Sequence, residues 1–175
     1  MTALAPPPDL NAINRMDRDA FVAALGSTFE HSPWVAESAW QARPFASIDA
    51  LHGAMIDVVL RAPQQQQIAF LCGHPELAGK EAQAGAMTDE SVGEQSSAGL
   101  DALSRAEIAE LATLNASYRS RHGFPFIIAV RRYRKAEIFE QLRLRPERDS
   151  DTERLEALAQ IGVITRLRLD AKLAR

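Results

Sequence analysis

A chain of 175 residues, 46% of them hydrophobic and 25% charged, has the composition of an ordinary folded protein, which excludes a disordered or fibrous chain. Its length is typical of one compact domain. The formal net charge of -3 offers no broad positive surface to phosphates, so we expect no nucleic-acid partner.

No segment of the sequence resembles a signal for secretion or membrane insertion. Residues 1–5 lack both a basic and an apolar stretch, unlike a secretory signal. The longest apolar run, residues 124–130, is too short to cross a bilayer as a helix. The single cysteine, Cys72, cannot form an intramolecular disulfide. We therefore expect a cytoplasmic protein that does not bind membranes.

The N-terminal segment, residues 1–8, contains three consecutive prolines and little apolar surface, which predicts a mobile arm. Residues 9–175 are expected to form the folded domain. The first predicted helix has Asp17 as its N-cap, and its apolar residues recur at helical spacing as far as Phe29.

Three further helices are predicted before residue 75: one over residues 34–42, one capped by Ser47 and reaching Val59, and one from Pro63 to Cys72. The first should end ahead of Pro44, because proline disfavours the helical conformation of the preceding residue. Pro63 suits a first helical turn, and Gly73 suits a helix end.

The second half of the chain is predicted to contain two long helices. Ser104 and Glu107 have the spacing of a capping box, and the helix that they start should run to residue 121 and end at Gly123. Ser150 and Glu153 have the same spacing and are predicted to start a final helix that reaches about residue 173.

Two segments lack helical periodicity. Residues 75–90 are rich in Gly, Ala and Gln, which predicts a long ordered loop, and loops of this length are often functional. Residues 124–128 fit a short buried strand on pattern alone, although no second strand is evident to pair with it.

His74 directly precedes Pro75 at the predicted end of a helix. Proline holds the preceding residue in an extended conformation, which fixes the histidine and keeps its imidazole off the helix. Histidine is the side chain best suited to proton exchange near neutral pH, so His74 is a candidate acid or base. The alternative is a histidine that only caps the last helical carbonyls.

A second candidate group lies within residues 91–98. If these residues form one or two helical turns, Ser91, Glu94 and Gln95 share one face, which combines a hydroxyl, a carboxylate and a carboxamide. Such a face can donate and accept the hydrogen bonds of a urea or imide. Taken alone, the pattern favours the alternative of a solvated surface helix, since polar faces usually meet water.

Arg168 lies on the apolar stripe of the final helix, four residues after Ile164 and seven after Ile161. An arginine directed into a core must meet an anion or a set of carbonyls, and its planar fork suits a carboxylate. Such a residue would bind a substrate. The alternative is a structural ion pair, such as one with Glu94.

No metal site is predicted. The four histidines, His31, His52, His74 and His122, show no spacing typical of zinc ligands. The signatures of serine hydrolases, P-loop proteins and dinucleotide-binding folds are also missing from the sequence.

Several short motifs occur together in an order that resembles the family of 2-oxo-4-hydroxy-4-carboxy-5-ureidoimidazoline (OHCU) decarboxylases. They are NRM at residues 14–16, EHSPW at 30–34, HPELAG at 74–79, SxxEQxxAGL at 91–100, LNxxY at 114–118, GFPFI at 123–127 and LRL at 167–169. Each motif is short, but their order and spacing make a specific signal over nearly the whole chain.

The resemblance implies an all-α fold, a single-domain helical bundle, and usually a homodimer. It implies conversion of the small molecule OHCU, an intermediate of urate oxidation, to (S)-allantoin and carbon dioxide. By position, His74 and Glu94 would be the catalytic pair. The substrate pocket would include Pro75, Ser91, Gln95, Phe126, Ile127, Ile128 and Arg168. For residues 124–128 the resemblance implies a buried extended segment that lines this pocket, in place of a strand.

The implied reaction needs no cofactor, because a C=N group beside the departing carboxylate accepts the electrons within the substrate. We hypothesise that His74 polarises the substrate hydroxyl and shuttles its proton, while Glu94 orients His74 or that hydroxyl. Gln95 would bind the ureido group, and Arg168 would hold a carboxylate or ring carbonyl. We therefore expect His74, Glu94 and Arg168 to converge on one pocket.

Two other functions compete with this prediction. The same pocket could serve a lyase or hydrolase that acts on another ureide. The chain could instead be a non-catalytic helical interaction module, in which case His74, Glu94 and Arg168 would be scattered over its surface.

Overall fold

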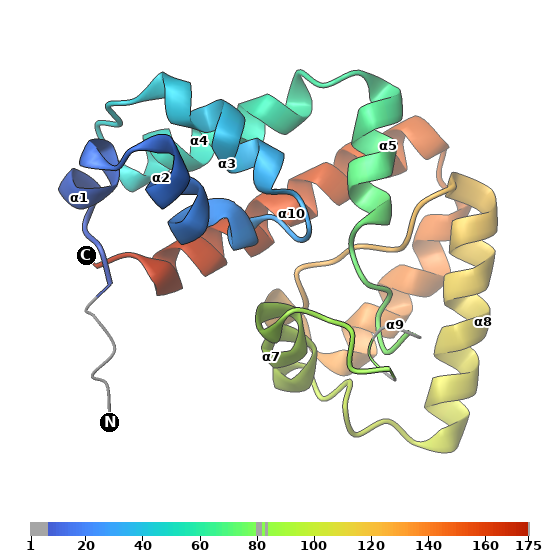
Figure 1. Cartoon of the computed structure of the whole chain (residues 1–175). Coiled ribbons are helices and arrows are strands. Elements are labelled where there is room, and N and C mark those ends of the chain that lie inside the picture. Colours follow the sequence, from blue (N-terminus) through green and yellow to red (C-terminus); the bar gives the residue numbers. More distant parts are fainter. Residues whose placement is uncertain (1–6, 80–81, 83, 175) are drawn as a thin grey trace, which may run out of the picture. The chain divides into compact units, whose positions relative to one another are not determined.

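The computed structural model describes residues 7–79, 82 and 84–174, and the described chain is all-α, as predicted, with no strand in it (Figure 1). The predicted arm, residues 1–8, lies mostly outside the described residues. The α-helices are α1 (Leu10–Arg15), α2 (Arg18–Leu25), α3 (Pro33–Ala39), α4 (Ile48–Leu60), α5 (Gln64–Cys72), α7 (Asp89–Ser97), α8 (Arg105–His122), α9 (Lys135–Leu144) and α10 (Ser150–Lys172). Short 3-10 helices are η1 (Gly26–Thr28), η2 (Trp40–Ala42), η3 (Val130–Arg132) and η4 (Arg145–Glu147). No helix among the described residues is both long and apolar enough to span a membrane.

The chain forms two compact units. Unit 1 comprises Met1–Pro63 with Gly162–Arg175, and unit 2 comprises Gln64–Ile161. The helix α10 therefore supplies residues to both units.

Unit 1 is built around α3, which packs against both α2 and α4 through buried apolar side chains. The N-caps of α2 and α4 are Asp17 and Ser47, as predicted. The first helix is shorter than expected, because α2 ends at Leu25 and the chain tightens into η1, a common ending for an α-helix. The helix α1, capped by Asp9, was not predicted.

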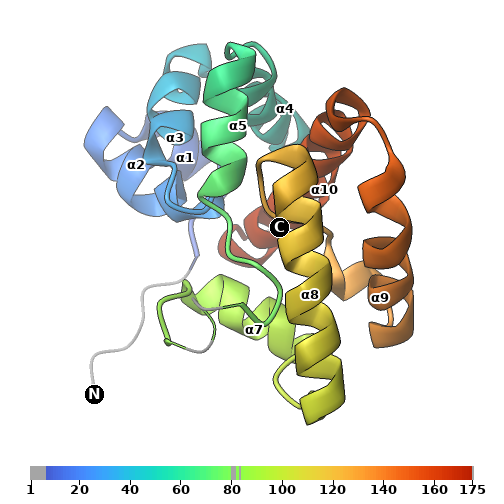
Figure 2. The same cartoon turned by 90° about the vertical axis from the view of Figure 1, so that its right-hand side faces the viewer.

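Unit 2 contains the long helix α8, with α9 packed beside it (Figure 2). The predicted capping box is present, since Ser104 Oγ accepts the Glu107 amide and the Glu107 carboxylate accepts the Ser104 amide. Gly123 ends α8 with a φ of 82°, a left-handed conformation that glycine adopts without a Cβ clash. The helix α9 was not predicted.

Residues 124–129 are all buried but carry no regular secondary structure, so the strand suggested by the pattern of residues 124–128 is wrong. A strand needs a neighbouring strand for its backbone groups. Here two backbone groups instead bind side chains, because Ile127 O accepts from Arg145 and the Ala129 amide donates to Gln160.

The start of α10 also differs from the prediction. Asp149, one residue before the helix, accepts hydrogen bonds from the Asp151 and Thr152 amides, each at 3.0 Å, and is therefore the cap. Ser150 is already the first helical residue. The carboxylate of Glu153, predicted to complete a capping box, is directed instead into the core of unit 2.

Candidate active site

His74 lies at the end of α5, where its amide donates to Leu71 O at 3.1 Å. Its side chain is buried, and its imidazole meets the ring of Phe70 edge-on at a centroid distance of 5.6 Å. Pro75 then directs the chain away from the helix. The imidazole is therefore fixed by a helix end on one side and a rigid residue on the other.

The residues after Pro75 are tied down by side chains from α7 and α8. Asn115 donates to Leu77 O at 3.0 Å, and Arg119 pairs with the Glu76 carboxylate at 2.7 Å. Gln95 Oε1 accepts from the backbone amide of Ala78 at 2.8 Å. These contacts give the histidine loop, residues 74–78, a defined path over unit 2.

The helix α7 buries its polar face. Ser91, Glu94 and Gln95 are exposed by only 4%, 9% and 7%, whereas Val92 on the same helix is 46% exposed. The expectation of a solvated polar face is therefore wrong for these residues. Burying polar groups while exposing a valine costs stability, which points to a site that needs a hydroxyl, a carboxylate and a carboxamide.

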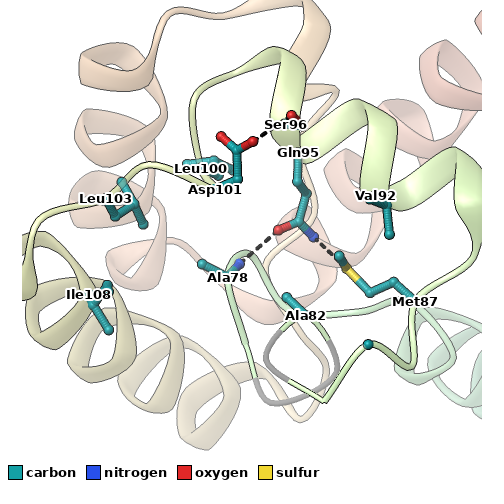
Figure 3. A pocket seen from close by; sticks show the side chains of 11 residues that line it. Ala78, Ala82, Met87, Val92, Gln95, Ser96, Leu100, Asp101, Leu103 and Ile108 are labelled. Carbon is teal, nitrogen blue, oxygen red and sulfur yellow. Dashed lines mark hydrogen bonds between the residues drawn. The ribbon is translucent and has the colours of Figure 1, made fainter.

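A cavity of about 640 Å³ lies beside α7 (Figure 3). It is mostly apolar, and its lining includes Met87, Val92 and Leu100. Gln95 is the predicted site residue found in its wall, where the carboxamide nitrogen contacts Met87 Sδ at 3.3 Å. His74, Ser91 and Glu94 are not among the described lining residues.

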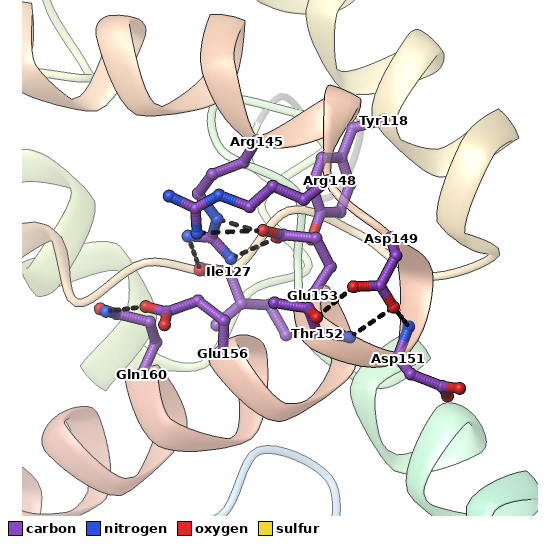
Figure 4. Close-up of polar contacts among 10 residues, drawn as sticks. All are labelled: Tyr118, Ile127, Arg145, Arg148, Asp149, Asp151, Thr152, Glu153, Glu156 and Gln160. Atoms are coloured by element: carbon purple, nitrogen blue, oxygen red, sulfur yellow. Dashed lines mark hydrogen bonds and ion pairs between the residues drawn. The ribbon is translucent and has the colours of Figure 1, made fainter.

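A buried charge cluster at the start of α10 was missed by the sequence analysis (Figure 4). Arg145 and Glu153 have side chains exposed by only 1% and 0%, and Arg145 Nε donates to Glu153 Oε2 at 2.9 Å. Tyr118 donates its hydroxyl to the same oxygen at 2.6 Å, and the more exposed Arg148 approaches the other oxygen at 3.3 Å. The sequence signal was weak, because charged residues usually lie at the surface.

This cluster contacts the segment predicted to line the pocket. Arg145 Nη1 donates to Ile127 O at 3.1 Å, and its guanidinium carbon lies 4.5 Å from the centre of the Phe126 ring. Two residues further on, the Ala129 amide donates to Gln160 Oε1 at 2.9 Å. Phe126, Ile127 and Ile128 are all buried within unit 2.

Burial and hydrogen bonding shift two titratable groups around this cluster. The pKa of Tyr118 is raised far above its usual value, first by burial and then by its hydrogen bond to the Glu153 carboxylate. Burial lowers the pKa of His122, whose ring packs on Tyr118 at 4.5 Å and contacts Ser150 Oγ at 2.9 Å. Both shifts favour the uncharged form of the group.

Arg168 belongs to unit 1, where it is buried as predicted. Its Nη1 pairs with the fully buried Glu30 carboxylate at 2.9 Å and lies 3.4 Å from Thr28 O. Within unit 1 its carboxylate partner is thus Glu30. Arg166, on the same helix, pairs with Asp49 and Asp170. The convergence of Arg168 with the histidine loop stays a prediction.

The described residues contain no group of three or more His, Cys, Asp and Glu side chains that could hold a metal ion. Unit 2 does bring together two parts of the predicted site, the histidine loop and the buried polar face of α7, through the bond between Gln95 and Ala78. The segment at residues 126–128 leads into η3, which packs on α7.

Comparisons with known proteins point to one family. The family model described as OHCU decarboxylase matches residues 14–170. A protein of Haloferax volcanii named 2-oxo-4-hydroxy-4-carboxy-5-ureidoimidazoline decarboxylase is 42% identical over 160 residues, which cover 91% of this chain and 93% of that protein.

Two crystal structures share the fold. The structure of an (S)-allantoin synthase is 27% identical with a TM-score of 0.75, and the match covers 94% of this chain and 54% of that one. An OHCU decarboxylase crystallised in the presence of (S)-allantoin is 23% identical with a TM-score of 0.64, over 87% of this chain and 96% of that one.

Proposed function

Because the chain belongs to the OHCU decarboxylase family, we propose that its histidine loop and the buried polar face of α7 carry out the reaction of that family. The enzyme is a carboxy-lyase of urate degradation, which converts OHCU to (S)-allantoin and carbon dioxide. The observation that best supports the proposed site is the polar face of α7, where Ser91, Glu94 and Gln95 are buried while Val92 is exposed.

The reaction breaks the bond between a ring carbon and its carboxylate, and this carbon also bears a hydroxyl. The electron pair of the broken bond forms a C=C bond to the neighbouring carbon, and the C=N pair moves to nitrogen, which takes up a proton. The resulting enol loses its hydroxyl proton and gains one at the ureido-bearing carbon. Protonation of one face of that carbon sets the handedness of allantoin.

We assign the proton transfers to His74, which is buried and held between a helix end and Pro75. A positioned imidazole can take the hydroxyl proton of the substrate and return a proton to the product. Glu94 would accept a hydrogen bond from the imidazole or the hydroxyl and stabilise the protonated imidazole. Both residues lie in unit 2.

The remaining pocket residues would bind and orient the substrate. Ser91 can donate to or accept from a ring carbonyl or hydroxyl, and Pro75 with Phe126, Ile127 and Ile128 would enclose the ring. Gln95 is proposed to bind the ureido group. Because its carboxamide already binds Ala78 N and lies 3.4 Å from Glu76 O, the ureido group would have to share these bonds or replace the longer one.

The function is tested with freshly generated OHCU, by following the appearance of optically active allantoin with circular dichroism. Uncatalysed decay gives a racemate, so a growing signal reports the enzyme alone. Action on another ureide, or a purely non-catalytic role, would leave the reaction at the uncatalysed rate with racemic product.

We propose that Arg168 binds a carboxylate or ring carbonyl of the substrate, and we expect Arg168→Lys to lower kcat/KM by about tenfold or more while changing the melting temperature little. Lysine keeps a positive charge opposite Glu30 but offers a single hydrated ammonium in place of a planar fork. Loss of one charge-assisted hydrogen bond, about 1.5–3 kcal/mol, is enough for this decrease. Turnover and thermal unfolding should be measured on the same preparation.

The matched control is Arg166→Lys on the same helix, because Arg166 is more exposed and pairs with Asp49 and Asp170. This control should retain wild-type kcat/KM. A destabilised but fully active Arg168→Lys enzyme would show that Arg168 is only the structural partner of Glu30.

We also propose that the protein is a cytoplasmic homodimer, as the family resemblance implies. Light scattering coupled to size-exclusion chromatography would test the dimer, and a monomer at all concentrations would rule it out. Fractionation of the source cells would test the location.

A further inference from the structure

We propose that Arg145 is a positioning residue that holds the substrate-binding segment, residues 126–128, in its active conformation. The proposal rests on the function proposed above, because it assumes that this segment lines the OHCU pocket. Arg145 itself would not touch the substrate. It would act through the ring of Phe126 and the carbonyl of Ile127, both of which it contacts.

The contacts of Arg145 fix both the side chain and the backbone of the segment. Its guanidinium lies over the Phe126 ring at 4.5 Å, and the Tyr118 ring meets Phe126 edge-on at 5.3 Å. Phe126 is therefore contacted by two rigid groups. The hydrogen bond of 3.1 Å to Ile127 O then sets the direction of the next peptide group.

The segment needs such partners because it is buried without a neighbouring strand in the described chain. A buried backbone carbonyl without a hydrogen bond costs free energy, and Arg145 supplies that bond for Ile127. Gln160 supplies the corresponding partner for the Ala129 amide. Hydrogen bonds from side chains thus replace the backbone hydrogen bonds that a neighbouring strand would supply.

Stability alone is a poor explanation for the charge of Arg145. A buried ion pair such as Arg145 with Glu153 usually contributes little net stability, because both groups lose their hydration. An apolar side chain of similar size could fill the same space. What it could not do is donate to Ile127 O while stacking on Phe126, and this difference favours a positioning role.

The segment is connected through η3 to α7, the helix that carries the proposed catalytic residue Glu94. The chain continues from Ala129 into η3, which packs against α7. The contact is close, since a Cβ built on Gly93 would lie 3.9 Å from Arg131 Nη2. Gly93 directly precedes Glu94. A shift of the segment would therefore displace the backbone next to the proposed catalytic carboxylate.

The test is Arg145→Lys, which keeps a charge beside Glu153 but cannot donate to Glu153 and Ile127 O with the same planar geometry. We expect kcat/KM for OHCU to fall about 10-fold to 100-fold, since small misplacements of binding groups have effects of this size. The decrease should appear mainly in KM, and affinity for (S)-allantoin in titration calorimetry should fall with it. Amide hydrogen exchange in residues 126–129 should become faster.

Two further variants separate positioning from folding. Arg143→Lys is the matched control, because Arg143 pairs with Glu110 at the surface, and it should leave kinetics and exchange unchanged. Gln160→Met removes the acceptor of the Ala129 amide at a half-buried site, so it should fold and show the same changes as Arg145→Lys. If Arg145→Lys fails to fold, these changes in Gln160→Met would still support positioning of the segment by its side-chain partners, and wild-type values would overturn it.

Wild-type KM, allantoin affinity and hydrogen exchange in the folded variants would overturn the positioning role. A Tm decrease without these changes would do the same, because it would show that the cluster only stabilises the fold. If the wild-type protein neither converts OHCU nor binds (S)-allantoin, the proposed function fails instead. Hydrogen exchange would still report whether Arg145 holds the segment.

Discussion

His74→Asn should abolish most turnover, with a loss of about 100-fold to 10,000-fold in kcat and an intact fold. This is the usual contribution of a positioned general acid or base. Asparagine can occupy the space of the inner part of the imidazole, but its carboxamide does not exchange a proton near neutral pH. Because the buried His74 ring also contacts Phe70, circular dichroism and thermal unfolding must confirm that the variant is folded.

The control for this variant is His31→Asn. The side chain of His31 is 60% exposed, and its backbone φ of 48° lies in the left-handed region, which asparagine tolerates. This variant should keep wild-type kcat. Near-normal turnover in a folded His74→Asn protein would remove His74 from the proposed mechanism and shift the proton transfers to another group.

Glu153→Leu should destabilise the protein by about 3–5 kcal/mol, the typical cost of leaving a buried charge without its partner. The substitution removes the carboxylate that pairs with Arg145 and accepts the Tyr118 hydroxyl. The side chains of Arg145 and Tyr118 are both fully buried, so water cannot easily replace the lost acceptor. Urea denaturation followed by circular dichroism measures the change.

Two comparisons identify the cause of this loss. Glu153→Gln keeps an acceptor oxygen and should cost less than Glu153→Leu. The double variant Arg145→Met with Glu153→Leu removes both charges and should be more stable than Glu153→Leu alone. A loss of less than about 1 kcal/mol in Glu153→Leu would mean that the charges reach solvent, since an exposed ion pair contributes no more than this.

The sequence was most informative where a local signal decides the structure. The capping pair Ser104 and Glu107 predicted the start of α8, and the left-handed turn at Gly123 follows from the lack of a Cβ. The helices α1 and α9 were missed because most of the stability of such helices comes from packing, which the sequence does not show directly. The apolar spacing of Ile138, Phe139 and Leu142 was the available signal for α9.

For the candidate site, too, local patterns predicted some features and could not predict others. Pro75 predicted a fixed His74 from local chemistry alone, and helical spacing placed Ser91, Glu94 and Gln95 on one face. Periodicity could not show that this face is buried, because the covering segments are distant in sequence. Partners such as Glu30 for Arg168, separated by 138 residues, depend on tertiary contacts that no local pattern encodes.

The left-handed conformation of Ala78 places backbone strain in the histidine loop. Its φ of 46° costs a non-glycine residue roughly 1–2 kcal/mol, and the bond to Gln95 Oε1 offsets part of this. Ala78→Gly would remove this steric cost. It would also stabilise the unfolded chain by about 0.4–1 kcal/mol, because glycine has more conformational entropy there. Global stability should therefore change little while the loop samples more conformations. Faster exchange of the residue 78 amide in Ala78→Gly would reveal this local mobility.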